Sequence, residues 1–234
     1  NLVVDLNSGK EEAFRAGHEA KHAENYRINS FHLGEGSPKQ KFRANMDAIY
    51  TLKTLENQHR DATPEEQETL ANYVGWGGLA DAFDAEKTAW AGEYKELKAA
   101  LTEEEYAAAR ASTLNAHYTS PTVIRAIYEA LDGMGFEKGN ILEPSMGVGN
   151  FFGMLPDSML GSRLYGVELD SITGRIAQKL YPQAEIKVAG FETTDRRDFY
   201  DLAVGNVPFG NYRVSDKPYD KLGFSIHNYF FAKA

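Results

Sequence analysis

Cysteine is absent from the 234-residue sequence. Without thiols the chain forms neither disulfide bonds nor thiolate metal sites, and this composition fits a reducing cytoplasm, where we expect the protein to be located. The sequence also has no apolar run long enough to cross a bilayer, so no membrane partner is expected. An initiator methionine is missing as well, and we therefore expect a piece of a longer protein.

An excess of positive charge is missing too. The chain has 34 acidic and 25 basic side chains, for a formal net charge of −9. Overall charge therefore does not hold it on nucleic acid, and any such contact must be local. The candidate basic spots are Lys39, Lys41 and Arg43, and separately Arg196 and Arg197. Runs of this kind are usually solvated faces.

The first half of the sequence has a helical texture. A polar leader at 1–37 precedes a predicted helical region at 38–115. Thr63 with Glu66 forms a capping box at the start of one expected helix, and Thr102 with Glu105 repeats the signal. Between these starts lies "YVGWGGL", which we interpret as a glycine-rich helix end around a packed Trp76.

The second half, 116–234, alternates between strands and helices. A helix is predicted to start at Ser120–Pro121, and "KLGFSIHNYFFAKA" is expected to end the chain as another. The predicted strands are "NILEP", "SRLYGVEL", "AEIKV" and "YDLAVGN", with a crossover helix in "SITGRIAQKLYP". This order predicts an α/β fold with about four mostly parallel strands. The sheet would be incomplete, and we expect its open edge either to pair two copies of the chain in a homodimer or to be covered by the N-terminal helices.

A glycine-rich turn follows the first predicted strand, in "ILEPSMGVGNFF". Gly147 and Gly149 allow a ligand to approach the backbone, and the next helix start offers free N–H groups. Phe152 occupies the third glycine position of G-x-G-x-x-G, so this is not the dinucleotide motif. Glu143 before the turn would repel a pyrophosphate but suits an ammonium group, such as that of S-adenosylmethionine (SAM).

A second acid ends the next predicted strand, in "YGVELD". Glu168 stands where a carboxylate accepts hydrogen bonds from both ribose hydroxyls in dinucleotide-binding proteins. The glycine turn, Glu143 and Glu168 together predict a SAM site. The alternative is a plain tight turn with acids that face solvent.

The stretch "DLAVGNVPFGNY" begins as a buried strand and breaks at Asn206, Pro208 and Gly210. An amide and an aromatic ring, Asn206 and Phe209, thus lie at the carboxyl end of a strand, where α/β proteins usually bind ligands. Asn also favours turns, so an ordinary turn residue is the alternative interpretation of Asn206.

With these motifs in this order, the chain resembles SAM-dependent N6-adenine DNA methyltransferases, which carry [D/N]-P-P-[F/Y/W] after the fourth strand. The resemblance covers about 116–234 and implies a Rossmann-like SAM-dependent methyltransferase fold. "AHYTSP", "LEPSMGVGNF", "GVELD" and "GFE" resemble its cofactor motifs. The residues implied to bind SAM are Tyr118, Thr119, Glu143, Pro144, Ser145, Gly147, Gly149, Phe151, Glu168, Leu169, Phe191 and Glu192.

The resemblance also implies a catalytic role for "NVPF", which comprises Asn206, Val207, Pro208 and Phe209. The Asn206 side-chain oxygen and the Val207 carbonyl would accept the N6 hydrogens, while Phe209 stacks on the base. The target adenine would be flipped out or single-stranded. Val207 replaces the family's usual proline, which leaves the turn less rigid.

The region before residue 116 favours DNA as the partner. "LGEGSPKQKFRANMDAIYTLKTLE" and "YVGWGGL" resemble the leader of very large methylase–helicase proteins of plasmids, phages and conjugative elements. The rest of such a parent chain would supply target recognition and possibly a helicase. Two alternatives stay open. One is a non-catalytic scaffold of a helicase protein, and the other is an N-methyltransferase for RNA or protein glutamine.

"HEAKH" at 18–22 matches H-E-x-x-H, the zinc protease signature. Lys21 places a charge where such helices are normally apolar, and no clear third ligand follows. We therefore expect no metal.

Overall fold

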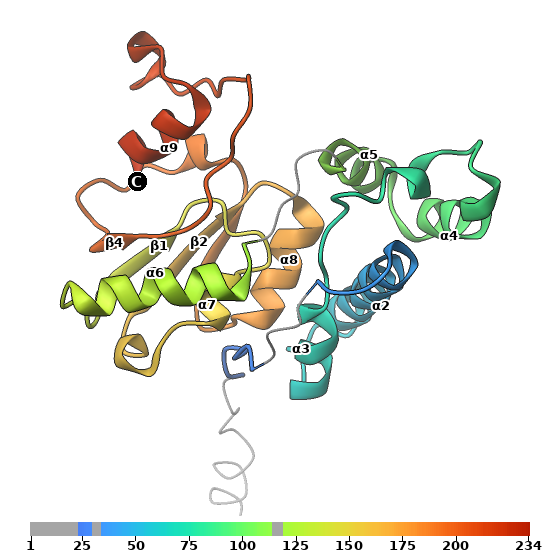
Figure 1. Ribbon diagram of the computed structural model, residues 1–234, viewed down its shortest axis with the longest axis horizontal. Helices are drawn as coiled ribbons and strands as arrows, with labels where there is room; N and C mark the ends of the chain where they lie inside the picture. The colour runs from blue at the N-terminus through green and yellow to red at the C-terminus, as the bar shows by residue number, and fades with distance from the viewer. Residues whose placement is uncertain (1–22, 30–33, 114–118) are drawn as a thin grey trace, which may run out of the picture.

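The computed structural model describes residues 23–29, 34–113 and 119–234. Its first part is helical, as predicted, with α2 (Pro38–Asn57), α3 (Pro64–Ala71), α4 (Ala91–Ala100) and α5 (Glu103–Ser112). Short 3-10 turns lie between α3 and α4, at Ala80–Phe83 and Thr88–Trp90. These helices lie to one side of the sheet (Figure 1).

Local capping explains where the helices begin. Thr63 and Glu66 form the predicted capping box of α3, and Thr102 and Glu105 form that of α5. Each pair satisfies backbone donors that the first turn of a helix leaves without partners. Ser120 accepts a hydrogen bond from the Val123 amide at the start of α6 (Pro121–Gly133).

The second part contains a four-stranded sheet in the order β3-β2-β1-β4. Its strands are β1 (Asn140–Glu143), β2 (Arg163–Glu168), β3 (Glu185–Val188) and β4 (Leu202–Ala203). All three pairings are parallel, which confirms the predicted α/β class. β4 is shorter than predicted, although the amides of Asp201 and Val204 also donate to carbonyls of β1.

Helices cover both faces of the sheet (Figure 1). α6, α7 (Asn150–Gly153) and α8 (Ser171–Leu180) share one apolar core with Ile141 of β1, while α9 (Ile226–Lys233) shares a second core with Leu142. Adjacent residues of a strand point to opposite faces, so Ile141 and Leu142 enter different cores. Further 3-10 turns lie at Asp157–Met159, Phe191–Thr193 and Asp220–Leu222.

The helical region packs against α8 and thereby against the sheet. The Gln67 side chain donates to the backbone carbonyl of Leu180, and Arg175 of α8 forms ion pairs with Glu105 and Glu56. Trp76 is 1% exposed and packs edge-on against Phe83, which confirms the predicted packed tryptophan. The two halves of the sequence therefore share one core.

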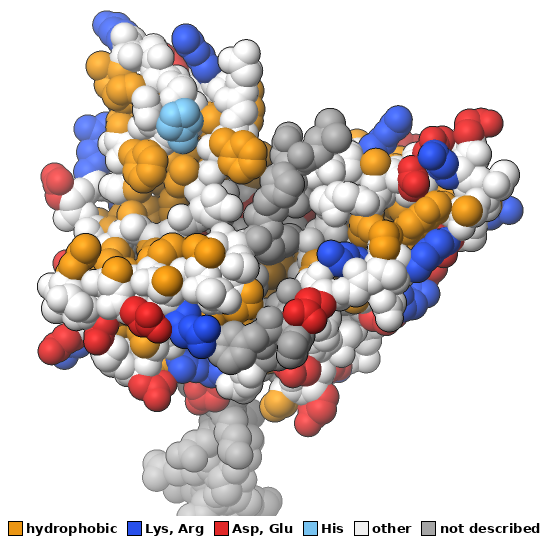
Figure 2. All heavy atoms as spheres, in the orientation of Figure 1, with side chains coloured by type: hydrophobic (Ala, Val, Ile, Leu, Met, Phe, Trp, Pro, Cys, Tyr) orange, Lys and Arg blue, Asp and Glu red, His pale blue; other side chains and the backbone are white. Residues whose placement is uncertain are grey.

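The surface mixes charges of both signs, and apolar side chains line the exposed side of α6 (Figure 2). Among the candidate basic residues, Lys39 pairs with Glu93, Arg43 with Glu96, and Arg196 with Glu185. These contacts fit the interpretation as solvated faces. No helix in the described ranges is long and apolar enough to span a membrane.

Candidate functional site

A cavity of about 460 Å³ opens where β1, β2 and β4 end, and the helical region forms part of its wall. This volume lies within the usual range for small-molecule sites. Carboxyl ends of parallel strands are also where open α/β sheets usually bind ligands. Position and size therefore both favour a ligand site.

The glycine turn and the end of β2 are joined by the Glu168 carboxylate. Its Oε2 accepts a 2.8 Å hydrogen bond from the Gly147 amide, and its Oε1 accepts one of 2.8 Å from the Asp170 amide. Gly147 has a φ of +57°, a left-handed conformation that favours glycine. Burial is the largest influence on the pKa of Glu168 and raises it, although the two amide donors lower it.

Glu143 at the end of β1 is a buried acid with an unused oxygen. The residue is 2% exposed. Its Oε2 has no hydrogen-bond partner among the described residues. Burial, and then repulsion by Glu168, raise the pKa of Glu143 well above its ordinary value. An unpaired buried carboxyl is costly, so this position calls for a donor or cation from a ligand.

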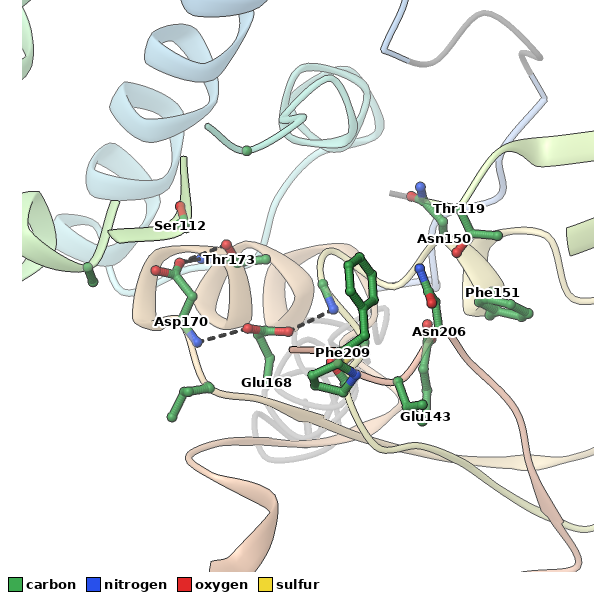
Figure 3. Close-up of a pocket in the computed structure, with 18 of the residues that line it drawn as sticks. Ser112, Thr119, Glu143, Asn150, Phe151, Glu168, Asp170, Thr173, Asn206 and Phe209 are labelled. Carbon is green, nitrogen blue, oxygen red and sulfur yellow. Dashed lines mark hydrogen bonds between the residues drawn. The ribbon is translucent and has the colours of Figure 1, made fainter. Parts of the chain in front are cut away.

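The segment after β4 brings its amide to the same cavity. Asn206, Val207, Pro208 and Phe209 all line it, and Asn206 and Phe209 are exposed. Asn206 lies near Glu143 and Asn150 toward one end of the close-up, and Phe209 stands between this group and Glu168 (Figure 3). The carboxyl ends of three strands therefore supply an amide, two acids and an aromatic ring to one space.

Most residues predicted to bind the cofactor line this cavity. They are Thr119, Glu143, Ser145, Gly147, Phe151, Glu168 and Leu169. Pro144, Gly149, Phe191 and Glu192 are not among the lining residues. Tyr118 and the "HEAKH" segment lie outside the described residues.

Three of the predicted residues that do not line the cavity make packing contacts or hydrogen bonds elsewhere. A Cβ atom on Gly149 would lie 2.5 Å from the Tyr181 ring, so this glycine allows a close approach to a core side chain. Phe191 stacks on Phe230 of α9 with ring centroids 5.0 Å apart. The backbone carbonyl of Glu192 accepts a hydrogen bond from Lys233.

The cavity also includes residues that sequence reasoning missed. Tyr73, Gly75, Ala108, Ala111 and Ser112 come from the helical region; the others are Met146, Asn150, Asp170, Thr173 and Tyr212. Asp170 ends the "GVELD" motif, and Gly75 belongs to the glycine-rich "GWGG", so both had a local signal. No comparable signal marks the alanines of α5.

The described residues hold no group of three or more His, Asp or Glu side chains arranged to bind a metal ion. The acids at the cavity instead hold backbone amides, as Glu168 does, or have an oxygen with no partner among the described residues, as Glu143 does at Oε2.

Comparison with known proteins shows two related sequences. The chain is 29% identical over 192 residues to "Defense against restriction protein B" of Escherichia phage P1, a match covering 80% of this chain and 7% of the phage protein. It is 34% identical over 92 residues to the type II methyltransferase M.CvrRI of Paramecium bursaria Chlorella virus XZ-6E. That match covers 39% of this chain and 24% of the viral protein. The chain is thus similar to a methyltransferase, as the motifs predicted.

The chain spans only a small part of both relatives, and no protein-family model matches it. Among solved structures, it has a TM-score of 0.40 and 12% identity to a Listeria monocytogenes protein described as a class I S-adenosylmethionine-dependent methyltransferase. This alignment covers 83% of the chain and 69% of the Listeria protein. A structural likeness at that score supports no functional conclusion.

Proposed function

We propose that the protein uses SAM to methylate N6 of adenine in DNA. One observation carries the proposal: the Glu143 carboxyl, whose Oε2 has no partner among the described residues, the Glu168 carboxylate and the Asn206 amide line a single cavity. Similarity to a type II methyltransferase and to a phage protein named for defence against restriction supports DNA as the substrate.

The acids of the cavity fit the two polar parts of SAM. Glu143 offers a buried, unpaired Oε2 to the amino group of the methionine end. Glu168 is oriented by the Gly147 and Asp170 amides, and its remaining lone pairs can accept hydrogen bonds from the ribose hydroxyls. When bound, SAM supplies the electrophilic methyl group.

Asn206 and Val207 would act on the target amine. The N6 lone pair of adenine is delocalised into the ring, which makes the amine a poor nucleophile. The side-chain oxygen of Asn206 and the carbonyl of Val207 can accept its two hydrogens and draw the nitrogen towards a tetrahedral geometry. Phe209, which is 56% exposed, is available to stack on the base. Holding the reactants in line supplies much of the remaining rate.

The test measures methylation by the full-length protein. Plasmid DNA incubated with it and SAM should gain N6-methyladenine, detected by sequencing. Asn206→Ala should abolish most of this signal. The matched control is Asn211→Ala, an exposed amide of the same segment that does not line the cavity.

Other outcomes separate the alternative functions. SAM binding with no methylation of any substrate would support a scaffold and contradict the proposal. Methylation found only in RNA, or only on protein glutamine, would keep the cofactor and overturn the DNA substrate. Absence of SAM binding by the folded protein would overturn the cofactor as well.

A further inference from the structure

The helical region forms one wall of the cavity. Tyr73 and Gly75 reach it from the segment after α3, and Ala108, Ala111 and Ser112 reach it from α5. Small side chains predominate on this wall, and both alanines are exposed, so it leaves room for a ligand. The neighbouring Ala107 is exposed as well but does not line the cavity.

A ligand is indicated independently by the opposite part of the cavity. The Oε2 atom of Glu143 is buried and has no hydrogen-bond partner among the described residues. In the close-up, Glu143 and Asn206 lie toward one end, whereas Ser112, Asp170 and Thr173 lie toward the other (Figure 3). We call the part of this wall formed by Ala108, Ala111 and Ser112 the α5 wall. It therefore lies at the end of the cavity away from Oε2 of Glu143.

Resting on the proposed function, we propose that the adenine ring of SAM binds against the α5 wall, between Leu169 and the small residues Ala108, Ala111 and Ser112. If Glu143 holds the amino group and Glu168 the ribose, the base must continue beyond Glu168. Asp170, Thr173 and Ser112 lie toward that end of the cavity (Figure 3), and Leu169, which directly follows Glu168, is 77% exposed. The helical region is then part of the cofactor site.

Ser112 supplies polar recognition of the base. Its hydroxyl donates a 2.8 Å hydrogen bond to the Ala109 carbonyl within α5. Because the hydrogen is engaged there, the oxygen presents lone pairs to the cavity. An acceptor suits the exocyclic amino group of adenine and does not suit a carbonyl at the same position. Phe191 and Glu192, which the resemblance implied to bind SAM, do not line the cavity.

Tyr73 contributes a buried side chain to this wall. The residue is 2% exposed, and it lines the cavity together with Asp170 and Thr173. Asn45 of α2 reinforces the segment, since its side chain donates to the Gly75 carbonyl and accepts from the Val74 amide. Gly75 has a φ of +68°, so glycine is the residue that adopts this turn without strain.

The first test fills the space beside α5 in the full-length protein. Ala111→Leu should weaken binding of S-adenosylhomocysteine at least tenfold, measured by calorimetry, because the larger side chain takes the volume of the base. Ala107→Leu makes the same change at an exposed α5 position outside the cavity and should leave the affinity unchanged. Melting temperatures of both variants check that the fold is kept.

The second test asks whether Ser112 reads the amino group. Wild-type protein should bind S-adenosylhomocysteine more tightly than S-inosylhomocysteine, in which a carbonyl replaces that group. Ser112→Ala should bring the two affinities several-fold closer, and Ser112→Thr, which keeps a hydroxyl, should restore part of the preference. A merely structural role of Ser112 would change both affinities equally.

These outcomes are distinct from failure of the proposed function. If Ala111→Leu binds S-adenosylhomocysteine as tightly as wild type does while Glu168→Ala does not, the α5 wall is not the adenine site, although the SAM site stands. A Ser112→Ala ratio equal to that of wild type would overturn the polar recognition. If wild-type protein binds no S-adenosylhomocysteine, both the proposed function and this inference are wrong.

Discussion

The Gly147 amide donates a 2.8 Å hydrogen bond to Oε2 of Glu168, joining the turn after β1 to the end of β2. The Asp170 amide holds the other oxygen at 2.8 Å. Both carboxylate oxygens are thus oriented before any ligand arrives. Such preorganisation lowers the cost of ordering the site on binding.

Replacing Glu168 should therefore affect binding strongly. Glu168→Ala removes the proposed ribose acceptor and leaves the Gly147 and Asp170 amides without this partner. We expect SAM affinity to fall by ~1.5–3 kcal/mol, the range for hydrogen bonds to a charged group. Calorimetry measures the change, with Glu137→Ala, an exposed acid before β1, as the control. Equal affinities for wild type and Glu168→Ala would refute the ribose assignment.

The buried carboxyl of Glu143 should make the fold less stable, although it strengthens SAM binding. Burial and the Glu168 charge raise the pKa of Glu143 in the folded protein. A raised pKa means that the protonated carboxyl stabilises the fold below the unfolded value of about 4.3, and that this contribution is lost as pH rises through the folded pKa. Glu143→Gln removes the titrating carboxyl, and with it this loss of stability as pH rises.

We therefore expect Glu143→Gln to have a larger free energy of unfolding than wild type above the raised pKa, by about 1–3 kcal/mol. The difference should shrink as pH falls towards about 4.3. Urea unfolding at a series of pH values measures it. The same variant should bind SAM more weakly, because an amide does not neutralise an ammonium group. If the variant is less stable than wild type at every pH of the series, the conclusion that Glu143 is a buried acid without a partner is contradicted.

Asn206 and Phe209 should give different kinetic signatures in the full-length protein. Asn206→Ala should lower kcat by ~10²–10³-fold, as for one preorganised polar group at a reacting centre, with little change in SAM affinity. Asn206→Asp keeps an acceptor and should retain more activity. Single-turnover methylation assays measure both variants, and unimpaired methylation by Asn206→Ala would leave this residue as an ordinary turn residue.

Phe209→Ala should instead weaken capture of the target base by ~1–3 kcal/mol, the scale of base–aromatic stacking. The loss should appear as a higher Kd for DNA with an unpaired adenine, while SAM affinity stays constant. Phe231→Ala, at an exposed aromatic residue outside the cavity, is the control. An equal effect of the two substitutions on DNA binding would exclude a specific role for Phe209.

A buried ion pair ties the segment after the cavity to α9. Lys233 and Asp216 lie 2.5 Å apart with side chains 7% and 8% exposed, and the Tyr229 hydroxyl also donates to Asp216. Burial by itself would raise the pKa of Asp216, but the hydrogen bonds from Lys233 and Tyr229 lower it overall. A depressed pKa gives stability above the unfolded value of about 3.9, which is lost as pH falls through the folded pKa.

Lys233→Met should leave the Asp216 charge buried without its cation and destabilise the protein by about 3–5 kcal/mol at neutral pH. Lys221→Met, at an exposed lysine of the same segment, should have little effect. Urea unfolding measures both variants. The deficit of Lys233→Met should shrink at acid pH, where Asp216 is protonated, and a deficit independent of pH would point to lost packing alone.

Local spacing in the sequence was enough to predict most strands, several helix starts and much of the cavity. Capping residues such as Thr63 and Thr102 act within three residues of their partners, so the helix starts could be read directly. Glu143 and Glu168 end β1 and β2, Asn206 follows β4, and parallel strands bring their carboxyl ends to one edge of the sheet. Their meeting at one cavity follows from that geometry.

Only tertiary packing decided the rest of the cavity wall. Ala108, Ala111 and Ser112 reach the cavity because ion pairs and apolar contacts hold the helical region against α8. Phe191 lies away from the cavity because its ring packs on the aromatic rings of α9, which cover the other face of the sheet. Such contacts join residues far apart in the chain and depend on how side chains fill a shared core, which the spacing of residues along a sequence does not specify.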